Sequence, residues 1–232
     1  MGGSKKRPNR NINHMKVKYL YGKYEFLAEL IEGRSGIRFS DLSHYSRLEN
    51  EKMRDDEMNK VFIPRKEELI IEINGYRLDN NDFASDPTFS VTPRHCYCLC
   101  MSNTGNNEGL YRDFKADTCI AFHVDELEKR IATSNEKFKG SHIVGSDITY
   151  YDQKTLHGLD KSPEKLVFYK PDFFAHESEY RIAWFYPLNK TGFLSDGRTI
   201  PFRFENESSH LFFFHKEKSF ITDCIVDVYR KS

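Results

Sequence analysis

Apolar residues alternate with polar ones along much of the chain, a pattern that predicts strands with one buried face. Such runs predict strands over 17–21, 37–40, 95–102, 118–124, 142–151, 180–186, 199–204, 211–214 and 220–229. Apolar positions recur at helical spacing over 25–31 and 126–132. We therefore predict a β-rich α+β domain whose helices lie mainly in the first two thirds of the chain.

Turn and cap residues mark several boundaries between these elements. Gly33 is expected to end the first helix, and Asp125 is expected to cap the second at its N-terminus. Ser162-Pro163 predicts the start of another short helix. Asn74-Gly75 lies between two short apolar runs and predicts a tight type I′ hairpin.

Residues 49–68 interrupt this pattern because charges dominate and apolar residues are too few to form a core face. We interpret the stretch as an exposed loop or a partly helical lid. Long connections of this kind are more often functional than short ones. The predicted organisation is a tail over 1–15 and a single domain over 16–232 that carries this insertion.

Charge is balanced overall, with 35 Lys and Arg against 35 Asp and Glu, so net charge does not indicate a partner. The first 24 residues nevertheless contain basic side chains and no acid. This basic tail can contact phosphates or an anionic partner. The simpler interpretation is a solvated, flexible terminus.

Cysteine usage indicates the compartment. The five cysteines, an odd number, occur without an apolar signal stretch, which favours a reducing, cytoplasmic location. No run approaches the ~18 apolar residues of a membrane span. Cys96, Cys98 and Cys100 share one face of a predicted strand, about 7 Å apart, which is too far for one zinc ion, so we expect core thiols and no metal site.

The most unusual chemistry lies at Glu177, Glu179 and Arg181, which share one face if the strand extends over them. Two neighbouring carboxylates repel and raise the pKa of one of them, while Arg181 partly offsets this. Such a pair can stabilise a positively charged, sugar-like transition state. A solvated, salt-bridged strand edge explains the same pattern, and the residues alone leave both interpretations open.

This block, together with several others, resembles a bacterial domain family of unknown function. The other matching residues are Lys18-Tyr19, 37–40, 98–102, Leu110-Tyr111 and Lys170. The 177–181 block is also similar to the E-x-E element of NAD-using ADP-ribosyltransferases, many of which are toxins or phage-conflict proteins. The resemblance covers the chain from about residue 16 and implies a split-sheet core with NAD as substrate.

The resemblance also implies roles for individual residues. Glu179 would be catalytic, bonding the ribose hydroxyl next to the reacting carbon, and Glu177 would activate or select the acceptor. Ser102 would support the nicotinamide ribose. The NAD site would further include Lys18, Tyr19, Arg38 and Arg181, with Lys18 and Tyr19 standing where the first strand usually offers Arg or His.

We therefore expect an ADP-ribosyltransferase-like enzyme, a toxin or phage-defence effector, with an antitoxin or inhibitor protein as a further expected partner. The acceptor would be a macromolecule, with nucleic acid slightly favoured over protein by the basic tail. One alternative is a metal-dependent nuclease that uses Asp147, Lys170, Glu177 and Glu179. The other is a non-catalytic binding module whose acidic pair lies on a solvated strand edge.

Overall fold

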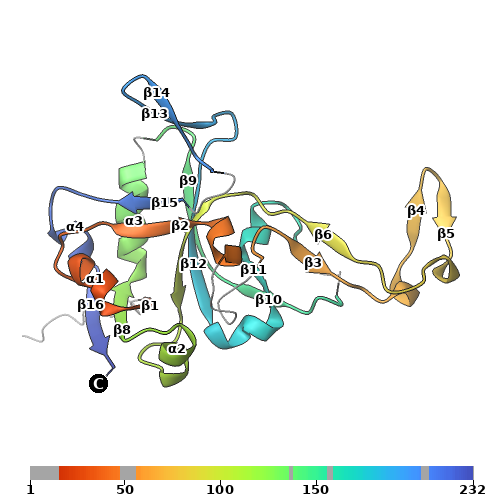
Figure 1. The fold of residues 1–232 in the computed structure, drawn as a ribbon, viewed down its shortest axis with the longest axis horizontal. Helices are drawn as coiled ribbons and strands as arrows, with labels where there is room; N and C mark the ends of the chain where they lie inside the picture. Colours follow the sequence, from red (N-terminus) through yellow and green to blue (C-terminus); the bar gives the residue numbers. More distant parts are fainter. Residues whose placement is uncertain (1–15, 48–55, 136–137, 156–158, 205–208, 232) are drawn as a thin grey trace, which may run out of the picture.

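The computed structural model describes residues 16–47, 56–135, 138–155, 159–204 and 209–231. Eight strands form one antiparallel sheet, around which the other elements are arranged (Figure 1). These strands are β1 (Val17–Gly22), β2 (Ile37–Asp41), β7 (Tyr97–Ser102), β8 (Thr118–His123), β9 (His142–Asp147), β12 (Glu179–Phe185), β15 (His210–Phe213) and β16 (Ile225–Arg230). The predicted strand-rich α+β class is confirmed.

The sheet divides at β7. One edge of β7 pairs with β12 along its length, and β9 follows β12. The other edge pairs with β2 through Ser40 and Cys98 and with β1 through Tyr19 and Ser102. β1 continues into β8 and β16, whereas β2 continues into β15. The sequence between β1 and β2 forms α1 (Tyr24–Ile31), as its apolar spacing predicts, and Gly33 follows it with a φ of 68°.

Both faces of the central strands β7 and β12 are buried. Alternate residues of β7 and β12, including Leu99, Met101 and Ile182, belong to the main core together with residues of α3 (Val124–Asn135). The opposite face carries Cys98 and Ala183 in a second apolar cluster. The period-two alternation read from the sequence is therefore confirmed for both strands.

The three cysteines at β7 belong to a core cluster, as expected. Cys100 is partly buried against this cluster, while Cys96, directly before β7, and Cys98 are buried thiols whose Sγ atoms lie 3.5 Å apart. This is closer than the predicted spacing of about 7 Å, because that value applies to the backbone and side chains can lean together.

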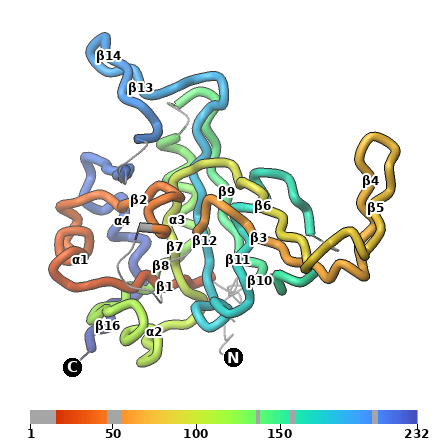
Figure 2. Tube along the Cα trace, turned by 45° about the vertical axis from the view of Figure 1, so that its right-hand side comes forward, coloured from red at the N-terminus to blue at the C-terminus, as the bar shows by residue number. Residues whose placement is uncertain are grey.

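Two hairpins project from the molecule, and the first lies beyond β3 and β6 (Figure 1, Figure 2). One consists of β4 (Ile71–Ile73) and β5 (Tyr76–Leu78), where Asn74 and Gly75 both have positive φ, as a type I′ turn requires. The other consists of β13 (Gly192–Ser195) and β14 (Arg198–Pro201). The predicted Asn-Gly hairpin is confirmed.

Several predicted boundaries were wrong. The single strand expected over 142–151 is two strands, because β10 (Thr149–Tyr151) leaves the sheet to pair in parallel with β11 (Tyr169–Pro171). The strand expected over 220–229 begins as a helix, α4 (Ser219–Thr222). Asp125 lies in the first turn of α3 and is not its cap.

Two more local features differ from the sequence prediction. Ser162-Pro163 precedes a 3-10 turn over Lys165–Phe168, and no longer helix forms there. The helix α2 (Glu108–Asp113) was not predicted; the side chain of Asn107 caps it by accepting a hydrogen bond from the N–H of Leu110. No helix among the described residues is long and apolar enough to cross a membrane.

The charged stretch is only partly exposed where the structure describes it, because buried residues alternate there with exposed ones such as Asp56 and Glu68. Residues 48–55 and the basic tail over 1–15 lie outside the described residues. After them, Glu57, Lys60 and Phe62 are buried, and β3 (Lys60–Phe62) pairs with β6 (Phe89–Val91). Burial is tolerated because the buried charges pair with opposite charges.

The core position of Ile182 gives a test of this fold. Ile182 is fully buried in β12, so Ile182→Ala should lower the free energy of unfolding by about 2–5 kcal/mol. Trp184 is the only tryptophan, and it is buried, so its fluorescence reports urea unfolding directly. The control Ile200→Ala, at a site that is 47% exposed, should change stability by less than about 0.5 kcal/mol. Equal losses in the two variants would contradict this placement of the core.

Candidate active site

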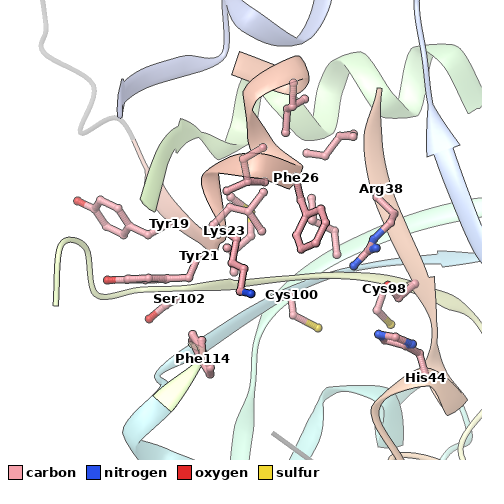
Figure 3. A pocket seen from close by; sticks show the side chains of 18 of the residues that line it. Tyr19, Tyr21, Lys23, Phe26, Arg38, His44, Cys98, Cys100, Ser102 and Phe114 are labelled. Carbon is pink, nitrogen blue, oxygen red and sulfur yellow. The ribbon is translucent and has the colours of Figure 1, made fainter. Parts of the chain in front are cut away.

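A cavity of about 670 Å³ opens where β1 and β2 diverge from β7 (Figure 3). Its volume is within the range of about 300–1,000 Å³ found for small-molecule sites. Residues of α1, β1, β2 and β7 line it together with charged side chains at β11 and β12. Those that matter for the argument are Tyr19, Arg38, Ser102, Glu177, Glu179 and Arg181.

Six buried charges are connected by contacts and alternate in sign, and four of them line this cavity: Lys170, Glu177, Glu179 and Arg181. Arg181 contacts both Glu57 and Glu179, at 2.6 and 2.8 Å. Lys170 Nζ lies 2.6 Å from Glu177 Oε2 and 3.3 Å from Glu179 Oε2. We call this set the buried ion network; in order of contact it is Lys60, Glu57, Arg181, Glu179, Lys170 and Glu177.

The strand β12 supplies two members of the network. Glu179 and Arg181 are two residues apart and share the face that period-two alternation predicts. The Nε of Arg181 donates to Glu179 Oε1 at 2.8 Å, and its Nη1 donates to the carbonyl oxygen of Val167 at 2.7 Å. The guanidinium is therefore held from two sides.

Glu177 reaches the site differently from the sequence prediction. It ends a 3-10 turn over Asp172–Glu177, and Ser178 follows in the left-handed conformation with a φ of 46°. Glu177 is thus not on the strand face, and β12 begins only at Glu179. Lys170 from β11 nevertheless brings the two carboxylates together by contacting both of them.

Backbone hydrogen bonds fix the turn that carries these glutamates. Ser102 Oγ donates to the carbonyl oxygen of Glu177 at 2.7 Å, and the N–H of Asn103 donates to that of Ser178 at 2.7 Å. The N–H of Glu179 donates to the hydroxyl oxygen of Tyr150 at 2.7 Å. The end of β7 and the strand β10 therefore hold both carboxylates in place, as a preorganised electrostatic site requires.

The two carboxylates differ in protonation. Burial alone raises the pKa of Glu179, but the charges of Arg181 and Lys170 outweigh it and hold that pKa below its usual value. For Glu177, burial outweighs the attraction of Lys170 and raises the pKa to about 7. One carboxylate therefore stays ionised at neutral pH while the other exchanges a proton. The main cause is burial, with repulsion between the pair as a smaller contribution.

Four of the five predicted NAD-binding residues line the cavity: Tyr19, Arg38, Ser102 and Arg181. Ser102 on β7 is directly opposite Tyr19 on β1 and Glu179 on β12. Arg38 extends from β2 toward the cavity, where Figure 3 shows it opposite Tyr19 and Ser102. Arg181 also lines the cavity, although its donors are bonded within the ion network.

Lys18 does not belong to this cavity, contrary to the sequence prediction. Its Nζ donates to Asp147 Oδ1 at 2.8 Å and lies 4.4 Å from the centre of the Tyr180 ring. Strand alternation explains this, because neighbouring residues of β1 point to opposite faces and Tyr19 faces the cavity. Of Lys18 and Tyr19, which were both expected to bind NAD, only Tyr19 therefore lines the cavity.

The alternatives left open by the sequence fit less well. Asp147 bonds Lys18 on the face opposite Glu177 and Glu179, so the proposed nuclease set is not brought together. Among the described residues, no group of three or more His, Cys, Asp or Glu side chains is arranged to hold a metal ion. A solvated strand edge is wrong, because Glu177 and Glu179 are each only 5% exposed.

Sequence reasoning missed Glu57 and Lys60. Both residues stand in a stretch dominated by charged side chains, so the local sequence does not distinguish them from charged neighbours that face solvent. The one available signal is the apolar run over 61–64, directly after Lys60, which indicates a buried strand rather than a loop. The partner of Glu57 is Arg181, which is 124 residues away and cannot be found from local pattern.

Comparison with known proteins adds no assignment to this geometry. No protein-family model, curated protein or solved structure matches the chain.

The raised pKa of Glu177 predicts a pH-dependent stability. The folded state binds a proton that the unfolded state releases between the ordinary glutamate pKa and about 7, so Glu177 stabilises the fold at low pH and this contribution is lost as pH rises through 7. Glu177→Gln should remove this dependence, changing the slope of unfolding free energy by up to about 1.4 kcal/mol per pH unit. Chemical denaturation at several pH values between 5 and 8 measures it. Identical slopes in the two proteins would refute the assignment.

Proposed function

We propose that this chain is an NAD-dependent ADP-ribosyltransferase-like enzyme with the split-sheet architecture typical of that superfamily. It cleaves the bond between nicotinamide and ribose and transfers ADP-ribose to a macromolecule. The observation that carries the proposal is the alignment of Tyr19, Ser102 and Glu179 across three strands at one cavity. The buried, ionised carboxylate at the end of that line is the group the chemistry needs.

The proposed reaction places positive charge on the ribose. The bond between ribose C1′ and the nicotinamide nitrogen breaks, its electron pair leaves with neutral nicotinamide, and the ribose becomes oxocarbenium-like. Glu179, ionised and removed from water, stabilises this charge more strongly than a solvated carboxylate does. The reaction depends on carboxylate electrostatics and invokes no metal.

Glu177 suits the second half of the reaction. The acceptor nucleophile attacks C1′ and must release its proton as the new bond forms. A pKa of about 7 leaves Glu177 partly ionised at neutral pH, so its carboxylate can take that proton. Lys170 holds Glu177 next to Glu179, which places the proton acceptor beside the reacting centre.

Binding groups for the rest of NAD lie further along the cavity. Arg38 is exposed to it, and a guanidinium is suited to bonding phosphate oxygens. Tyr19, Tyr21 and Phe114 present aromatic surface on which planar rings can pack (Figure 3). Arg38 therefore takes the role that the superfamily usually gives to an Arg or His on its first strand.

The acceptor follows from less direct observations. The basic residues before β1 favour nucleic acid slightly over protein, since they can neutralise phosphates. A cytoplasmic toxin or phage-defence effector of this kind would be paired with an antitoxin or inhibitor protein. Incubating cell extract with labelled NAD and identifying the labelled product by mass spectrometry reports activity and acceptor together.

The role of Glu179 is tested by Glu179→Gln. Nicotinamide release from NAD should fall at least about a hundredfold, the scale for losing one preorganised charge-stabilising group. Release is measured by chromatography, with folding checked by Trp184 fluorescence. The matched control Glu72→Gln removes an exposed carboxylate from the projecting hairpin and should leave the rate unchanged. Equal turnover in wild type and Glu179→Gln would reject the proposed mechanism.

Arg38 gives a separate test of the binding mode. Arg38→Gln should raise the KM for NAD about tenfold or more, because a hydrogen bond to a charged group contributes about 1.5–3 kcal/mol. The kcat should change little, since Arg38 is on β2 and outside the ion network. Arg77→Gln, on the exposed strand β5, is the matched control. A loss confined to kcat would contradict a phosphate-binding role.

A further inference from the structure

Glu57 enters the ion network from a part of the chain that is otherwise separate from the site. Its side chain is 1% exposed. It contacts Arg181 through both oxygens, with Oε1 accepting from Nη2 at 2.6 Å and Oε2 from Nη1 at 3.0 Å. Lys60 Nζ donates to Oε2 at 2.6 Å. Glu57 and Arg181 therefore form a bidentate ion pair, and Lys60 adds a second cation to Glu57. The proposed reaction gives Glu57 no role.

The position of Glu57 is held by a turn and by the packing of residues that follow it. The carboxylate of Asp56 accepts from the backbone N–H of Met58 at 3.2 Å and from Asn59 Nδ2 at 2.8 Å, which closes a turn around Glu57. Met58 packs against the apolar cluster behind β12, and Phe62 is fully buried in a neighbouring cluster. The carboxylate of Glu57 is thus a rigid point to which Arg181 is bound.

The geometry of Arg181 connects this rigid point to the candidate catalytic carboxylate. A guanidinium is planar, so fixing its terminal nitrogens also fixes the direction of Nε–H. In Arg181 the terminal nitrogens bond Glu57, while Nε donates to Glu179 Oε1. Without Glu57, Nη1 would keep only the carbonyl oxygen of Val167 and Nη2 only its 2.8 Å contact with Glu179 Oε1. The guanidinium would then lose the bidentate partner that sets its orientation, and Glu179 would lose its present alignment.

We infer that Glu57 is a positioning residue, which orients Arg181 and thereby keeps the Glu179 carboxylate aligned at the cavity. The effect of Glu57 on catalysis rests on the proposed function. Its effect on the protonation of Glu177 is independent of that function. Six charged or titratable groups surround Glu57. They are Lys60 on β3, Cys98 on β7, Lys170 on β11, Glu177 in the turn before β12, and Glu179 and Arg181 on β12. The negative charge of Glu57 also contributes to the raised pKa of Glu177.

The first measurement is independent of any activity. Glu57→Gln removes one buried negative charge, so the pKa of Glu177 should fall from about 7 by at least about half a pH unit. Carboxyl-¹³C-glutamate NMR follows this titration, with the Glu177 signal assigned through Glu177→Gln. The matched control is Glu68→Gln, an exposed carboxylate in the same charged stretch, which should leave the titration unchanged. An unchanged Glu177 titration in Glu57→Gln would overturn the inference.

The second measurement separates orientation from charge balance. Glu57→Gln should lower kcat for NAD cleavage about 10- to 100-fold with KM nearly unchanged, because small misplacements of a catalytic group cost this much. The double variant Glu57→Gln/Lys60→Gln removes one anion and one cation together, so the net charge of the network stays zero. It replaces the single variant in this measurement if Glu57→Gln does not fold. The loss in kcat should persist in this double variant. Wild-type kcat in either folded variant of an active enzyme would overturn the positioning role.

The two measurements also distinguish this inference from the proposed function. If the wild-type chain releases no nicotinamide but the Glu177 titration shifts in Glu57→Gln, the proposed function fails and the electrostatic role of Glu57 stands. If the wild-type chain is active but Glu57→Gln titrates and turns over like wild type, the proposed function stands and Glu57 has no positioning role.

Discussion

The structure depends on the burial of six charges at one point. Each buried charge alone would cost several kcal/mol of desolvation, and only good geometry with opposite charges offsets this cost. The buried ion network meets that condition because its charges alternate in sign and every contact lies between 2.6 and 3.3 Å. It joins two segments that are far apart in the chain, at 57–60 and at 170–181, since Glu57 and Arg181 are 124 residues apart. Their relative placement is therefore set by electrostatics as much as by the apolar cores around them.

The divided sheet places this network beside an open cavity. β7 is shared by β12 on one edge and by both β1 and β2 on the other, so β1 and β2 must diverge, and the cavity opens between them. The strand order thus brings Tyr19, Ser102 and Glu179 to one line without any of them being close in sequence. Further along β7 and β12, both faces of these strands are packed against apolar clusters, which gives the polar groups at their ends a rigid support.

Local regularities of this fold could be predicted from the sequence, and long-range pairings could not. The alternation over 95–102 and 180–186 identified both central strands, because residues two apart on a strand share a face whatever the rest of the chain does. The same alternation could not say which face of β1 meets the cavity, so Lys18 and Tyr19 were both expected there. Glu57 was missed because its only distinguishing feature is a partner 124 residues away. The placement of Glu177 in a turn depends on a left-handed Ser178, a conformation that serine does not signal.

The different protonation of the two glutamates follows from where each one stands relative to Arg181. Both share Lys170, and both are almost fully buried, so neither factor distinguishes them. Glu179 is on the strand beside Arg181 and gains a second cation, which outweighs its burial. Glu177 lies in the turn before β12 and does not contact Arg181 directly. The effect of burial on its pKa therefore outweighs the attraction of Lys170. The left-handed turn at Ser178, directly before β12, therefore separates two similar carboxylates into one fixed anion and one group that exchanges protons at neutral pH. This is the division of roles that a transfer reaction with a charged intermediate state and a proton-releasing acceptor requires.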